Sequence, residues 1–183
     1  MVRLLLGLVI GILLVPVAAY LWLSFGKVPV AVTDPELPHE REITSIPLDA
    51  RIQHEMIVTP PMQVDENTLV AGAHIYTDRC SVCHGLHGKS SAFGSEMFPE
   101  APQLLEKHHN SSVVGVSDDP PGETYWKIYN GIRLSGMPSF RTQLTETQMW
   151  QVTLLLANAD RPVPPAALDI LNHASPPPAE TIK

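Results

Sequence analysis

The chain has two cysteines, and both lie in the stretch R-C-S-V-C-H-G-L-H-G, residues 79–88. Two residues separate Cys80 from Cys83, and His84 follows directly. In an exported chain, C-x-x-C-H is the pattern of c-type haem attachment. The two thiols can add across the two vinyl groups of one porphyrin, and the histidine then falls beneath the iron, where its Nε2 can be the proximal ligand. We therefore expect one covalent haem c, held by Cys80, Cys83 and His84.

Three other kinds of site use a pair of thiols. A thioredoxin-like dithiol would want a βαβ context, which the sequence lacks, and it leaves His84 without a role. A structural zinc site needs four ligands; His87 could supply one, but no second pair of ligands follows at the usual spacing. A disulfide across two intervening residues closes a short loop and stabilises little. The motif therefore favours haem over these alternatives.

A second axial ligand would make the iron an electron carrier rather than a site for small molecules. Met137 is the best candidate because it stands outside helical periodicity, in the loop N-G-I-R-L-S-G-M-P-S-F, residues 130–140. Gly136 lets the backbone approach a haem closely, and Pro138 fixes the direction of the loop. The other candidate methionines are Met56, Met62, Met97 and Met149.

For two of these alternative methionines the sequence suggests a specific role. Met149 lies within the apolar run of a helix and is better explained as core, whereas Met97 could be either ligand or core. His108 or His109 could also take the sixth position; this would lower the reduction potential, since Met/His ligation raises it.

The N-terminal region has the composition of a membrane anchor. Residues 4–25 contain no charge, and as a helix they would extend roughly 33 Å, enough to cross a hydrocarbon core of about 30 Å. Arg3 precedes the run, and aromatic residues gather at its far end, as at a lipid–water interface. The alternative is a signal peptide cleaved after Ala19, although its apolar region is usually only about 7–15 residues long. Either reading sends the rest of the chain across the membrane into the periplasm, and the anchor reading predicts a single-pass protein of the bacterial inner membrane.

The rest of the chain divides into three regions. Residues 26–64 are rich in proline and lack a sustained helical period, so we expect an extended connector. Residues 65–160 hold both cysteines and the convincing helix signals, whereas residues 161–183 are expected to be a mostly disordered Pro-rich tail with one helical turn. The net charge of −7 argues against nucleic acid as a partner.

Helix signals predict that the central region, residues 65–160, is all-α. Asp65 can cap a helix over residues 65–79. Asp119 can cap a second helix over residues 120–130, with Gly131 just past its end.

A third helix is predicted over residues 145–159, where Thr145 and Gln148 form a capping box. A short helix over residues 102–107 is also expected. No pattern of alternating strands is present between these elements.

These motifs together resemble the class I c-type cytochromes, in particular the bacterial membrane-anchored kind with a single haem. The resemblance covers residues 65–160 and implies three main helices around one haem, with His84 and Met137 as axial ligands. It also implies that the carbonyl of Pro102, or alternatively Pro99, accepts the Nδ1–H of His84, a bond that fixes the tautomer. The matching features are C-S-V-C-H-G at residues 80–85, A-P-Q-L at 101–104, G-M-P-S-F at 136–140, the helix-crossing positions Gly72 and Tyr76, and Trp150 on the last helix.

The expected function is electron transfer by a haem domain tethered to the periplasmic face of the inner membrane. Its partners would be redox proteins, such as a dehydrogenase or an oxidase. One alternative is a dedicated haem-carrying subunit of such a complex. A peroxidase-like haem enzyme, which would need an open sixth position, is disfavoured by the loop that carries Met137. The chain is accordingly expected not to be an enzyme in its own right.

Overall fold

The computed structural model describes residues 1–109 and 111–174, and this part of the chain is helical, without a β-strand. The described residues fall into two compact units that divide between Ile43 and Thr44. The all-α expectation is therefore confirmed. The helices are α1 (Val2–Phe25), α2 (Glu40–Glu55), α3 (Glu66–Ile75), the π-helix η1 (Tyr76–Cys80), α4 (Ser81–His84), α5 (Ala92–Ser95), α6 (Pro121–Asn130), α7 (Glu146–Ala157) and α8 (Pro165–His173).

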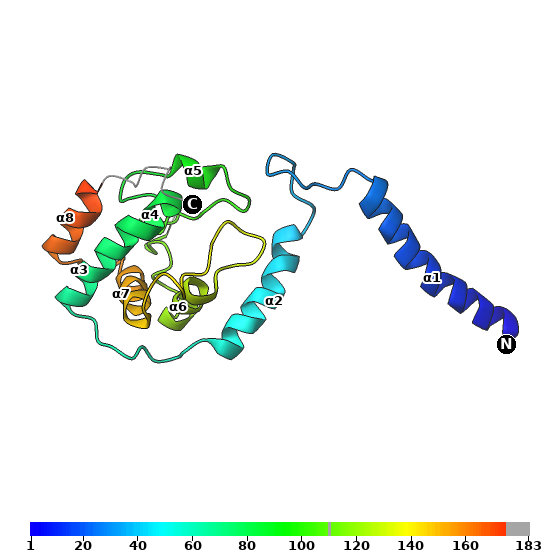
Figure 1. Ribbon diagram of the computed structural model, residues 1–183, viewed down its shortest axis with the longest axis horizontal. Coiled ribbons are helices and arrows are strands. Elements are labelled where there is room, and N and C mark those ends of the chain that lie inside the picture. Colours follow the sequence, from blue (N-terminus) through cyan, green and yellow to red (C-terminus); the bar gives the residue numbers. More distant parts are fainter. Residues whose placement is uncertain (110, 175–183) are drawn as a thin grey trace. The chain divides into compact units, whose positions relative to one another are not determined.

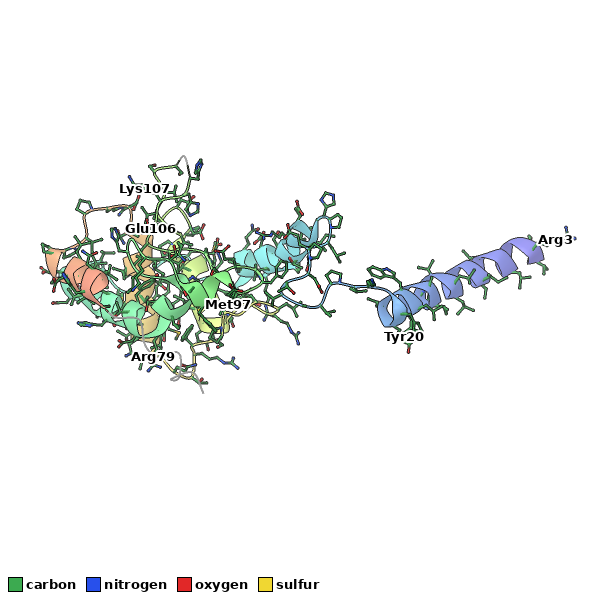
Figure 2. The ribbon with its side chains drawn as sticks, turned by 90° about the horizontal axis from the view of Figure 1, so that it is seen from above. Arg3, Tyr20, Arg79, Met97, Glu106 and Lys107 are labelled. Carbon is green, nitrogen blue, oxygen red and sulfur yellow. The ribbon has the colours of Figure 1, made fainter. Side chains whose placement is uncertain are left out.

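Helix α1 is long and apolar enough to cross a membrane. The candidate span runs over Leu5–Phe25 with a mean hydropathy of 2.4, and none of its most apolar window is buried within the protein. Figure 2 shows Arg3 and Tyr20 near the opposite ends of this helix. The exposed apolar side chains along its length would be covered by lipid.

Helix α2 corrects the expectation of an extended connector. It occupies Glu40–Glu55 in the middle of the proline-rich region and contains Pro47. Acidic residues in its first turn, Glu40 and Glu42, favour the positive end of the helix dipole. Near its other end, Ile52 is only 1% exposed. Burial of this one side chain stabilises a helix that has little apolar periodicity.

The second compact unit is built on the crossing of α3 and α7 (Figure 1). Gly72 makes this crossing possible: a Cβ added there would lie 2.5 Å from the carbonyl oxygen of Gln151 and 3.0 Å from Leu155 Cβ. Trp150 of α7 is fully buried and stacks on Tyr125 of α6, with ring centroids 4.2 Å apart. The core thus joins three helices, with α7 packed against both α3 and α6.

The ends of the predicted helices are mostly, but not entirely, as expected. The capping box of Thr145 and Gln148 is present at the start of α7, and Asp65 caps α3. Helix α6 begins one residue later than predicted, with Pro120 as its N-cap. Asp119 therefore precedes the N-cap, and its carboxylate lies 3.4 Å from Lys127 Nζ.

The expected short helix over residues 102–107 does not form. Its backbone pairs with a later segment instead: Gly115 N–H donates to the Glu106 carbonyl at 3.0 Å, and Lys107 forms a β-bridge with Val114. These partners replace the hydrogen bonds that a helix would have made.

Helix α8 corrects the expectation of a disordered tail as far as residue 174. Residues Ala167 and Leu171, four positions apart on one face, are 0% and 2% exposed. Helix α8 packs against α3 (Figure 1). Pro165 occupies the first turn, where a missing N–H costs nothing. The remainder of the tail, 175–183, lies outside the described residues.

Candidate haem-binding site

The cysteine motif lies on a widened helical turn. Where α3 ends, the π-helix η1 begins, and the N–H of Ser81 donates to the carbonyl of Tyr76, five residues back. π-Helical turns are frequent at functional sites. The turn brings Cys80, Cys83 and His84 onto η1 and the single-turn helix α4.

The side chain of Tyr76 holds the backbone at the end of the cysteine motif. Its ring is fully buried, and its hydroxyl donates to the carbonyl of Gly85 at 2.9 Å, with the carbonyl of His84 at 3.3 Å. Gly85 has a φ of +72°, a conformation that favours glycine. The chain therefore leaves the motif in a direction set by one buried hydrogen bond and one glycine.

The ring of His84 is oriented by a backbone carbonyl. Its Nδ1 lies 2.7 Å from the carbonyl oxygen of Pro102, and since a carbonyl can only accept, Nδ1 carries the proton. Nε2 is then left with a lone pair for a metal. Burial lowers the pKa of His84, with the bond to Pro102 acting in the opposite sense, so the neutral, metal-binding form is favoured. This contact is the one that the resemblance implied for Pro102, and it does not involve Pro99.

The two thiols do not have the properties of a redox dithiol. Cys80 and Cys83 are both free. Burial, followed by the charge of Cys83, raises the pKa of the Cys80 thiol to about 12, and burial also raises the pKa of Cys83. Catalytic dithiols need the reverse, a lowered thiol pKa.

A zinc site is likewise unsupported: over residues 1–109 and 111–174, no cluster of three or more His, Cys, Asp or Glu side chains could hold a metal ion. His87, the additional ligand considered above, is exposed. The remaining donor set consists of two thiols that can form thioethers and one imidazole with a free Nε2. These residues fit a covalently attached haem.

Met137 lies in a loop that is closed on itself. Its carbonyl accepts from Ile132 N–H at 3.2 Å, and its own N–H donates to Ser135 Oγ at 3.2 Å. The loop starts at Gly131 with a φ of +70° and ends where Phe140 N–H donates to the Ile128 carbonyl. Met137 is partly buried and packs against the hydrophobic core.

The other proposed ligands have different surroundings. Met149 is 2% exposed and belongs to the core, and Met62 packs against the same core. His108 Nε2 is 2.6 Å from the carbonyl of Gly115, so this ring nitrogen is engaged elsewhere. His109 is exposed.

One feature of the site was missed by sequence reasoning: the segment after the motif folds back onto it. Gly94, in α5, lies so close to the motif that an added Cβ would be 1.9 Å from the carbonyl oxygen of Cys83. Ser91 caps α5, accepting from Gly94 N–H at 2.9 Å, and its hydroxyl donates to the carbonyl of Val82. The only signal in the sequence was a serine three residues before a glycine, which is too common to identify such a contact.

Comparison with known families agrees with this geometry. Residues 67–155 match the family model described as cytochrome C oxidase, cbb3-type, subunit III. The matched range includes the cysteine motif, Pro102 and the loop of Met137. No curated protein matches the chain.

Proposed function

We propose that the chain, whose residues 67–155 match a c-type cytochrome family model, is a membrane-tethered electron carrier with one haem c and a class I c-type cytochrome domain. Domains of this kind support haem-based electron transfer. The observation that carries the finer proposal is the 2.7 Å contact between His84 Nδ1 and the Pro102 carbonyl, because it prepares Nε2 for an axial bond.

Each site residue has one task in this proposal. Cys80 and Cys83 would hold the porphyrin through thioether bonds, and His84 and Met137 would supply the protein's two ligands to the iron. When bound, the haem supplies an iron that alternates between ferric and ferrous states. Pro102 keeps the proton on Nδ1 of His84, which maintains the ring in its ligating tautomer.

Helix α1 is proposed to be the tether. With Arg3 retained on the cytoplasmic side, as the positive-inside rule favours, the cytochrome domain lies in the bacterial periplasm. Tethering raises the concentration of the domain near redox complexes in the same membrane.

A dedicated subunit of an oxidase complex is the second candidate. It is favoured by the description of the matching family, which names a subunit of a cbb3-type oxidase. The chemistry of the haem is the same in both cases, and only the permanence of the partnership differs. Extraction of membranes in mild detergent separates them: co-migration of haem-stained protein with an oxidase or dehydrogenase supports a subunit, whereas elution alone supports a tethered carrier.

Axial ligation is tested by the ferric spectrum of the full-length protein. We expect low-spin iron with a methionine–iron charge-transfer band, which disappears in Met137→Ala and persists in the control Met56→Leu. High-spin iron in the unmodified protein would contradict the carrier and favour a haem with an open sixth position. Persistence of the band in Met137→Ala would contradict the assignment of the ligand.

A further inference from the structure

The segment between the cysteine motif and Pro102 reaches the loop that carries Met137. We infer that Met97 is a positioning residue, whose thioether holds this loop closed and keeps other ligands from the sixth position of the iron. This inference rests on the proposed function, since it concerns how the Met137 bond to iron is maintained. Met97 is labelled in Figure 2.

The contact between Met97 and the loop is direct. A Cβ added at Gly136 would lie 2.8 Å from Met97 Sδ, 3.1 Å from its Cε and 3.6 Å from its Cγ. Three consecutive side-chain atoms of Met97 therefore pack onto the backbone of the residue that immediately precedes Met137. A side chain at position 136 would require the Met97 thioether to move.

The other end of the segment is fixed to the motif. Gly94 abuts the Cys83 carbonyl, and it accepts through its own carbonyl from Ala101 N–H at 3.1 Å and from Met97 N–H at 3.3 Å. Met97 thus stands three residues from an anchored point. Residues 94–97 connect the backbone of the thioether-forming motif to the backbone of the axial-ligand loop.

Packing of the hydrophobic core does not explain Met97. Among the described residues, the core contacts Met137 and Met62 but not Met97. Met97 is half-buried, and its flexible thioether is suited to filling an irregular gap beside a loop. The position of the Met97 side chain is therefore explained by its contact with the loop at Gly136.

The loop that carries Met137 contains an unfavourable backbone conformation. Leu134 has a φ of 64° and is 86% exposed, so one non-glycine residue adopts a left-handed conformation that costs free energy. Two hydrogen bonds involving Met137 close the loop from within, and the Met97 contact supports it from outside. Removing that contact should increase the fraction of molecules in which the loop is open.

The test measures how readily imidazole displaces the native ligand in the ferric, haem-loaded full-length protein. A competing ligand binds only the open form, so its apparent affinity rises with the open fraction. For Met97→Ala we expect the charge-transfer band to persist at rest, with imidazole bound about tenfold more tightly. Met97→Leu, which keeps the volume without the sulfur, should stay within about twofold of the unmodified protein.

Gly136→Ala tests the same contact from the other side, because its Cβ would displace the thioether. We expect tighter imidazole binding than in the unmodified protein, as in Met97→Ala, and this variant retains the test if Met97→Ala yields no haem-loaded protein. Met56→Ala serves as the control and should leave imidazole affinity unchanged.

Two results would overturn the inference. Imidazole affinity that is unchanged in Met97→Ala and Gly136→Ala would show that the contact does not hold the loop. Loss of the charge-transfer band in Met97→Leu would make Met97 itself a ligand rather than a positioning residue. Both differ from failure of the proposed function, which would be seen as high-spin iron in the unmodified protein.

Discussion

Replacing Gly72 by alanine tests whether the α3–α7 crossing limits the stability of the domain. The added Cβ would lie 2.5 Å from the Gln151 carbonyl oxygen, about 0.9 Å short of ordinary contact, which begins at 3.4 Å. Alanine in place of glycine improves helix propensity by about 1 kcal/mol. Overpacking costs about 1–3 kcal/mol, and the upper end applies here because the obstructing atom belongs to the backbone of a buried helix.

The expected net effect is a loss of about 2 kcal/mol in the free energy of unfolding. For a domain of this size, this corresponds to a decrease in Tm of roughly 8–16 °C. Urea and thermal unfolding of the haem-loaded protein, followed by absorption and far-UV circular dichroism, would measure both quantities.

Gly122→Ala is the matched control, another glycine-to-alanine change within a helix. Its Cβ would lie 2.0 Å from the carbonyl oxygen of Ile57, but Ile57 is 44% exposed and follows α2 rather than lying within a helix. That segment can move away, so we expect a smaller loss of global stability than in Gly72→Ala. If Gly72→Ala is as stable as the unmodified protein, helix propensity outweighs the close approach and the reasoning is wrong.

Three further predictions concern separate contacts. Tyr76→Phe removes the donor to the buried Gly85 carbonyl and should lower the free energy of unfolding by about 1 kcal/mol without changing haem content; an unchanged urea midpoint would contradict it. A hydrogen bond from the Trp126 indole N–H and, to a lesser degree, the interaction with Arg51 hold the pKa of Glu55 below its ordinary value of 4.5. These contacts therefore stabilise the fold fully above pH 4.5, and this stabilisation is lost as the pH falls through the lowered pKa. Tryptophan fluorescence should therefore change in this acidic range, and the change should be absent in Glu55→Gln. Leu171→Ala should cost about 2–5 kcal/mol locally, seen as faster amide exchange in α8 with that of α6 unchanged; equal acceleration in both helices would show that α8 does not open as a separate unit.

Signals confined to a few neighbouring residues predicted the structure well. The pattern Cys80, Cys83, His84 predicts its chemistry from identity and spacing alone, and the match of residues 67–155 to a cytochrome family model agrees with that prediction. The capping box at Thr145 also needs only four residues, and it forms as expected.

Features that depend on distant residues were not predictable in this way. Glu55 of α2 pairs with Arg51 in the same helix, but it also accepts a hydrogen bond at 2.9 Å from Trp126, 71 residues away. Helix α8 buries Leu171 against a helix from the start of the domain. In each case tertiary contact outweighed local propensity.

Helix α2 also shortens the segment available as a linker, given α1 as the proposed anchor. From Thr44 onward its residues belong to the second compact unit, so they add nothing to the reach of a linker that could otherwise gain about 3.3 Å per residue. A shorter linker would confine the domain to a smaller volume, and effective concentration falls roughly as the −3/2 power of linker length. We therefore expect electron donors and acceptors whose docking faces lie close to the membrane surface.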